Sequence, residues 1–384
     1  MRKYVIFSVM LLLTVSLFGQ ELVEKWAIMA DDPAYEWFKS DYSTKGAAFN
    51  PVTGNVLVAA VDVERDEEEE IIGVDFDIIV LSGEDGTELG ALTPPAEGYR
   101  IFLRTDEEED NGDIVEVDIY DSFRGVAKVF VLPSGRIIAT NHTTSPDDNV
   151  NKLFVWEEEE IGGVPPLVIE HPAAVRSGNT LSAVEKDNGD ILVYVSTNHW
   201  GLDVYSLIKY EYTSATDTWE AVDETPVEIP RSFSMTVYED GTFSRNLLWN
   251  EVTFHNPDGS EIPGIGFNLS GHLYSCIYET PEGPVFVATS MYAQDADGIR
   301  FYQAADMESA KANDFTELLM LPRTEYFANP AIQGDGQLTM KLSEFEYPGQ
   351  PQLYFSVMIQ NQFIALFHWD TATPTSATIW QLFE

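Results

Sequence analysis

The feature that most constrains the fold is a hairpin pattern that occurs six times along the chain. Each copy has two β-rich runs joined by a turn that contains glycine. The first copy reads GAAFNPVTGNVLVAAV (46–61), and the later ones begin at residues 126, 181, 234, 273 and 338. A tight hairpin turn needs a residue that tolerates positive φ without a Cβ clash. We therefore expect positive φ at the turn glycines, which are Gly54, Gly135, Gly189, Gly241, Gly283 and Gly349.

Two further β-rich runs follow the hairpins, which makes consecutive groups of four strands. The strands are mostly apolar rather than alternating, so both faces of each sheet must be covered. Packing twisted four-stranded sheets around an axis covers both faces. The sequence predicts an all-β protein, a β-propeller of six four-stranded blades, with seven as the alternative count. The whole of residues 21–384 would form this single domain. A β-sandwich is the structural alternative, but it needs strands shared between two sheets.

One predicted strand, LVEKWAIM (22–29), has no partner close to it in the sequence. In a closed ring it would pair with the end of the chain, so that no sheet edge stays open. We expect TIWQLF (378–383) to be its neighbour.

The N-terminal segment and the cysteine content indicate the compartment in which the protein works. Residues 1–20 have the pattern of a secretory signal, with Arg2 and Lys3 followed by an apolar run, and a membrane anchor is the alternative. The single cysteine, Cys276, excludes disulfides within one chain and fits a buried strand position. We expect a secreted or periplasmic protein, not inserted in a membrane once the signal is removed.

The formal net charge of −43 is extreme for 384 residues. Such a surface repels phosphate backbones, so we expect no nucleic-acid partner, while cations and basic proteins are favoured. Excess carboxylates also keep an exported protein soluble and monomeric.

The stretches NPVTGNVLVAA, DIIVLSGEDGTELGAL, FRGVAKVFVLPSGRIIATNHTT and KLFVW resemble an uncharacterised family of secreted bacterial β-propeller proteins. The likeness is strongest over residues 40–200. It implies the fold and carries no catalytic residues. The glutamate-rich inserts depart from the family pattern.

Two similar triplets follow the second strands of the second and third predicted blades. Thr140-Asn141-His142 and Thr197-Asn198-His199 should lie on one face of the ring, and Trp200 follows the second triplet. Imidazoles, amides and an indole around a shallow cavity suit a sugar or another polar ligand. We therefore predict a ligand site made of Asn141, His142, Asn198, His199 and Trp200. In the alternative interpretation, Asn and His cap strand ends by bonding loop backbone.

Three acidic runs, 66–70, 106–110 and 157–160, are candidates for calcium binding or for solvated loop tips. The first two should lie on the triplet face and the third on the opposite face. Asp295 and Asp297 resemble part of a calcium loop, although the closing glutamate is missing. Calcium is the only cofactor that the sequence suggests.

No serine-hydrolase elbow, phosphate loop or complete catalytic set occurs in the sequence. We expect a secreted, non-catalytic propeller that binds, or acts as a scaffold for, an extracellular glycan or protein. The alternative is a propeller hydrolase or lyase acting on a sugar or lactone, with calcium as a possible cofactor. A subunit of a surface assembly is a third possibility.

Overall fold

The structure is a computed structural model. It describes residues 22–39, 46–65, 71–96, 98–99, 102–110, 113–120, 125–143, 150–172, 177–197, 207–222, 234–246, 252–267, 274–280, 283–290, 298–322, 336–344, 352–359 and 363–370.

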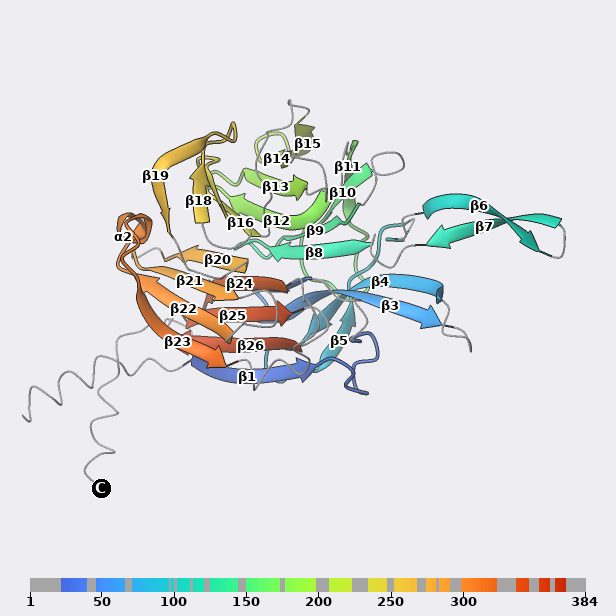
Figure 1. Cartoon of the computed structure of the whole chain (residues 1–384), viewed down its shortest axis with the longest axis horizontal. Coiled ribbons are helices and arrows are strands. Elements are labelled where there is room, and N and C mark those ends of the chain that lie inside the picture. The colour runs from blue at the N-terminus through green and yellow to red at the C-terminus, as the bar shows by residue number, and fades with distance from the viewer. Residues whose placement is uncertain are drawn as a thin grey trace, which may run out of the picture.

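The described residues form six antiparallel four-stranded sheets and one two-stranded hairpin. Figure 1 shows how these elements are arranged. The six-bladed propeller prediction is confirmed. Blade one contains β2 (Gly46–Phe49), β3 (Val56–Arg65), β4 (Ile71–Leu81) and β5 (Glu88–Ala91). Blade two contains β8 (Val126–Val131), β9 (Ile137–Asn141), β10 (Val150–Trp156) and β11 (Leu167–Pro172). Blade three contains β12 (Ser177–Glu185), β13 (Ile191–Thr197), β14 (Leu207–Thr213) and β15 (Thr218–Val222).

The remaining blades come from the second half of the chain and from its N-terminal strand. Blade four contains β16 (Ser234–Val237), β17 (Phe243–Asn246), β18 (Val252–His255) and β19 (Glu261–Phe267). Blade five contains β20 (Tyr274–Glu279), β21 (Val285–Ser290), β22 (Gly298–Ala304) and β23 (Thr316–Pro322), with the short helix α2 (Met307–Lys311) before β23. Blade six contains β24 (Gly336–Ser343), β25 (Gln352–Ile359), β26 (Phe363–Asp370) and β1 (Leu22–Met29).

The first strand of each blade is innermost, and these six strands close a ring. Each contacts the innermost strands of the two neighbouring blades, from β2 through β8, β12, β16, β20 and β24 back to β2. Six apolar clusters lie between neighbouring blades. In β3, Leu57 packs toward blade two, while its neighbour Val58 packs toward blade six. Successive side chains of a strand point to opposite faces, so an apolar strand covers two interfaces.

The two ends of the described chain meet in blade six. β1 pairs antiparallel with β26, from Leu22↔Trp369 to Met29↔Phe363. Closure between the chain termini is therefore confirmed, but the partner strand is FIALFHW rather than TIWQLF, which lies outside the described residues. β26 already forms the third strand of its blade, so β1 takes the outer edge.

The hairpin turns have the predicted backbone. Gly54, Gly135, Gly189, Gly241 and Gly283 all have positive φ, between 78° and 111°. Gly349 lies outside the described residues. The short helix after residue 306 is α2, and the Asp306 side chain caps it by accepting a hydrogen bond of 2.7 Å from the Ser309 backbone N–H.

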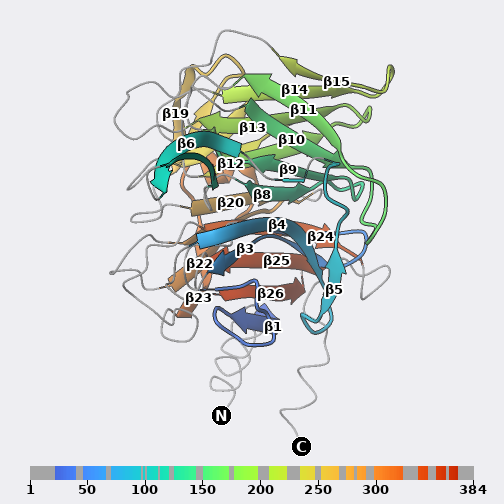
Figure 2. The ribbon, with the colours of Figure 1, turned by 90° about the vertical axis from the view of Figure 1, so that its right-hand side faces the viewer.

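Two ribbons extend from one side of the ring. β3 and β4 stay paired as far as Arg65↔Ile71, whereas β2 reaches only Ala59 along β3. The second ribbon is the hairpin of β6 (Phe102–Asp110) and β7 (Asp113–Tyr120), which lies between blades one and two in the chain. Both project to the right in Figure 1, and in Figure 2, which views the molecule from that side, β4 and β6 lie nearest the viewer. We call this side the hairpin face, and the opposite side, which carries the glycine turns, the turn face.

Among the described residues, no helix combines the length and the apolar character that crossing a bilayer requires.

Candidate functional site

The first predicted triplet lies at the hairpin face, but its side chains are inside the protein. Asn141 ends β9 and is fully buried, and His142 is only 2% exposed. The Asn141 side-chain oxygen accepts a hydrogen bond of 2.7 Å from the Lys152 backbone N–H, and its amide donates to the Val150 carbonyl at 3.1 Å. Asn141 thus ties the end of β9 to β10, as the capping interpretation describes.

A buried polar network continues from Asn141 into blade three. The Asn151 side-chain amide donates to Asn141 Oδ1 at 3.2 Å and to Ser177 Oγ at 3.1 Å. The Tyr210 hydroxyl donates to Asn151 Oδ1 at 2.6 Å. Burial raises the pKa of Tyr210, so this hydroxyl stays protonated as a donor. The network joins blades two and three.

The other predicted ligand residues, Asn198, His199 and Trp200, lie outside the described residues, as do Asp295, Asp297 and the acidic run 66–70. β9 and β13 end at the same face of neighbouring blades, so the chain enters both triplets on one side of the ring. Among the described residues, no group of three or more His, Cys, Asp or Glu side chains could hold a metal ion.

The hairpin face carries a dense acidic ribbon. The run 106–110, predicted as a solvated loop tip or calcium ligand, is instead the second half of strand β6. Residues 102–120 contain eight acidic residues and one basic residue. Glu107 pairs in register with Glu116, and Asp110 with Asp113. Like charges at facing positions destabilise a strand pair.

A second group of side chains, one of them aromatic, lies around the axis of the ring. Phe130 in β8, Cys276 in β20 and Lys341 in β24 belong to innermost strands, yet all three are part-exposed. The Lys341 Nζ lies 4.4 Å from the centre of the Phe130 ring. β24 and β8 are both neighbours of β2 in the ring, so this contact joins the blades on either side of blade one. We call Phe130, Glu185, Cys276 and Lys341 the axial cluster.

The surroundings of the axial cluster shift the pKa values of two of its members, Lys341 and Cys276. Burial lowers the pKa of Lys341 to about 8, although the carboxylate of Glu185, at the end of β12, acts in the opposite direction. Burial also raises the pKa of Cys276 to about 11, so the thiol is protonated at neutral pH. Cys276 lies in a strand as expected, but its side chain is part-exposed rather than fully buried.

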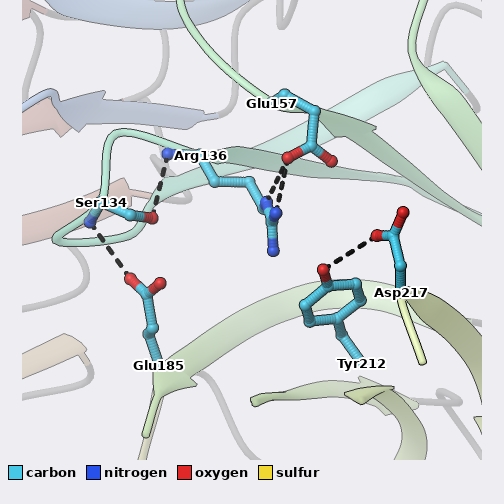
Figure 3. A network of polar contacts seen from close by, with 6 residues as sticks. All are labelled: Ser134, Arg136, Glu157, Glu185, Tyr212 and Asp217. Atoms are coloured by element: carbon cyan, nitrogen blue, oxygen red, sulfur yellow. Dashed lines mark hydrogen bonds and ion pairs between the residues drawn. The ribbon is translucent and has the colours of Figure 1, made fainter. Parts of the chain in front are cut away.

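Side-chain contacts on the turn face join blades two and three, and Figure 3 shows them. Arg136 Nε and Nη2 donate to Glu157 Oε2 at 3.0 and 2.5 Å, and the guanidinium lies 4.6 Å from the centre of the Tyr212 ring. The Tyr212 hydroxyl donates to Asp217 at 2.9 Å. The third acidic run (157–160) thus lies on the predicted face.

Near the axis, on the same face, the Ser134 backbone N–H donates to Glu185 Oε2 at 3.1 Å (Figure 3). This bond joins the β8–β9 turn of blade two to the end of β12 in blade three. It occupies one oxygen of the carboxylate that belongs to the axial cluster.

Blade four contains a buried histidine and arginine. Arg245 Nε donates to His255 Nε2 at 2.7 Å, and His255 Nδ1 lies 2.9 Å from the Gly259 carbonyl oxygen. The ring stacks on Phe243 with 5.1 Å between centroids. An acceptor at Nε2 and a donor at Nδ1 describe a neutral imidazole. Burial lowers the pKa of His255, and Arg245 adds to this effect.

Comparison with proteins of known structure supports the propeller fold. No family model matches the chain, and no curated protein matches its sequence. The structure is similar to that of a DUF4623 family protein from Bacteroides eggerthii, with a TM-score of 0.56 and 11% identity over 91% of this chain and 76% of that one. The designation of that family marks a domain of unknown function. The predicted resemblance to uncharacterised bacterial propeller proteins is confirmed at the level of the fold.

The structure is also similar to that of Trypanosoma rangeli sialidase in complex with sialic acid, with a TM-score of 0.46 and 9% identity. The similarity covers 95% of this chain, which spans 61% of the sialidase. A TM-score in this range does not support a functional assignment.

The axial cluster was not predicted from the sequence. The available signal was a single lysine inside the apolar strand run LTMKLS, on the first strand of a repeat hairpin. First strands line the axis of a propeller, so a charged residue there was a candidate for the centre of the ring.

Proposed function

We propose that this chain is an exported, non-catalytic binding or scaffold propeller, and that its partner is a protein with a basic surface that docks on the hairpin face. The observation that carries the proposal is the projection of the β3–β4 and β6–β7 ribbons from one side of a closed ring (Figure 1). The ring needs neither ribbon for closure, because its innermost strands already contact one another all the way round.

Charge favours a basic protein over a glycan. The ribbon 102–120 has a net charge of 1 − 8 = −7, and neutral sugar hydroxyls gain little from such a density of carboxylates. A two-stranded ribbon is marginally stable on its own in water, and facing pairs such as Glu107↔Glu116 weaken it further. A cationic partner would offset this repulsion and speed association through electrostatic steering.

The experiment compares two sets of neutralising substitutions in the full mature chain. One variant carries Glu107→Gln and Glu109→Gln on the β6–β7 ribbon. The matched control carries Glu158→Gln and Glu160→Gln, two exposed residues of the turn face. Titration calorimetry with a lysine-rich peptide in low salt measures the affinity of each variant.

We expect the ribbon variant to bind the peptide at least about threefold more weakly and with a smaller salt dependence. The control should bind like the unmodified chain. Equal weakening in both variants would show that binding follows net charge alone, and the docking face would be refuted. A glycan array on which neutral sugars bind the ribbon variant and the unmodified chain equally would favour a glycan partner instead.

Export has its own test. Expression of the full chain in a bacterium, followed by fractionation and N-terminal sequencing, should give a periplasmic or secreted product that begins near residue 20. A product that keeps residues 1–20 in the membrane fraction would support the anchor alternative.

A hydrolase or lyase acting on a sugar or lactone is the second candidate, and the axial cluster favours it. An amine, a thiol and a carboxylate from three blades come together there, and one pKa is displaced toward neutrality. Turnover of aryl glycosides or lactones that is lost in the Glu185→Gln variant would support this candidate over the scaffold.

A further inference from the structure

The amine of Lys341 occupies an unusual position for a lysine. It extends from the innermost strand of blade six to the ring of Phe130 in blade two, near Cys276 of blade five. Among the residues that the structure describes, its Nζ has no hydrogen bond or ion pair, whereas Lys152 pairs with Glu170 at 3.1 Å and Lys311 with Glu308 at 3.3 Å. Lys341 is part-exposed, so solvent molecules reach it.

The surroundings stabilise the neutral amine. An ammonium ion loses hydration beside an aromatic ring and an uncharged thiol, and the cation–π contact returns only part of that free energy. The carboxylate that acts on Lys341 belongs to Glu185, which also accepts a hydrogen bond from the Ser134 backbone N–H. The loss of hydration outweighs the opposing effect of Glu185, so a larger fraction of the amine is unprotonated than at an ordinary surface lysine.

We propose that Lys341 is a reactive amine site that captures small aldehyde-bearing molecules at the axis of the propeller as an imine. The unprotonated Nζ attacks the carbonyl carbon and forms a C–N bond, which gives a carbinolamine. Both amine protons leave with the former carbonyl oxygen as water, and a C=N bond remains. No oxidant or reductant is consumed, and water reverses the reaction. Phe130 supplies an apolar surface for the carbon chain of the ligand.

The test uses the full mature chain and glycolaldehyde, with sodium cyanoborohydride to reduce any imine to a stable secondary amine. Peptide mass spectrometry measures the modification rate at each lysine. Lys152 and Lys311 are matched internal controls, because their side chains are also part-exposed, at 26% and 28%. At pH 7 we expect Lys341 to react at least about tenfold faster than either control, because a larger fraction of its amine is neutral.

The pH profile separates reactivity from mere access. The Lys341 rate should rise with pH and level off above about pH 8. In the Glu185→Gln variant, loss of the carboxylate should move this plateau to lower pH. Equal rates at Lys341 and the controls, or a Lys341 rate that still rises above pH 9, would overturn the proposal. The experiment needs no binding partner, so its outcome is independent of the hairpin-face proposal.

Discussion

The Glu159 carboxylate accepts a hydrogen bond of 2.6 Å from the Asn55 side-chain amide, and this contact joins blade two to the first hairpin turn of blade one. Its other oxygen accepts from Asn50 Nδ2 at 2.8 Å and from Thr53 Oγ1 at 2.7 Å. A residue of the acidic run 157–160 thus bridges two blades at the hairpin turn of the first repeat.

Replacement of Glu159 by Gln should destabilise the protein by about 1–3 kcal/mol, because an NH₂ group would then face a donor in this turn. Urea unfolding measures the change in the free energy of unfolding. The control is Glu158→Gln in the same run, at an exposed position, which should change stability by less than about 0.5 kcal/mol. Similar losses in both variants would mean that charge density, not the bridge, determines the effect.

The Arg136–Tyr212 contact gives a second prediction at the turn face. Arg136→Lys keeps the charge but loses the planar stacking and the two bonds to Glu157, so we expect a loss of about 0.5–1.5 kcal/mol. A double-mutant cycle with Tyr212→Leu isolates the pair. A coupling free energy of zero between positions 136 and 212 would show that the stacking adds nothing.

Much of the fold could be predicted because each repeat contains apolar strand runs and a turn glycine that can be recognised in the sequence. The run VLVAAV (56–61) is apolar at every position, and in the structure alternate residues such as Leu57 and Val58 enter different interblade clusters. That pattern requires cover on both faces, which a ring of blades supplies. Gly54 in the preceding turn has φ 78°, as its place in the turn predicts.

The closing partner and the axial cluster could not be predicted in the same way. FIALFHW and TIWQLF are both apolar and aromatic, so composition alone cannot say which of them pairs with β1. Lys341 and Phe130 are more than 200 positions apart, and only the order of blades around the ring brings them together. Asn141 was correctly placed at a strand end, but its burial depends on the packing of blade three.

Ring closure by β1 gives a third prediction. Ile28 is 3% exposed and packs in the cluster between blades six and one. Ile28→Ala should cost about 2–4 kcal/mol through lost burial and a residual cavity. Val23→Ala, at a position 41% exposed in the same strand, is the matched control and should cost little. Thermal unfolding compares the two, and equal midpoints would mean that β1 does not close the ring.

Stability should depend on pH through His255. Its pKa is lowered in the folded protein, so the unfolded chain binds a proton first as the pH falls below about 6.5. The stability that neutral His255 contributes is complete above that range and decreases as the pH falls toward the folded-state pKa, by at most about 1.4 kcal/mol per pH unit.

Substitution of His255 by Gln tests this dependence. The variant should be destabilised more at pH 8 than at pH 5.5, because the unmodified protein loses its histidine contribution at the lower pH. Denaturant unfolding of both proteins at the two pH values gives the difference. A destabilisation that is the same at both pH values would show that His255 has the same pKa in the folded and unfolded states.

The β6–β7 ribbon gives the last prediction, which separates a functional feature from a structural one. β6 and β7 pair with each other and with no blade strand among the described residues. A chain in which residues 102–120 are replaced by a short Gly-Ser linker should therefore keep its unfolding midpoint to within a few degrees and lose the affinity of the hairpin face for a basic peptide. Removal of eight carboxylates also lowers the self-repulsion of a chain with a net charge of −43, which would raise the midpoint slightly at low salt. A large fall in the midpoint would mean that the ribbon supports blades one and two, and its acidic residues would then need a structural explanation.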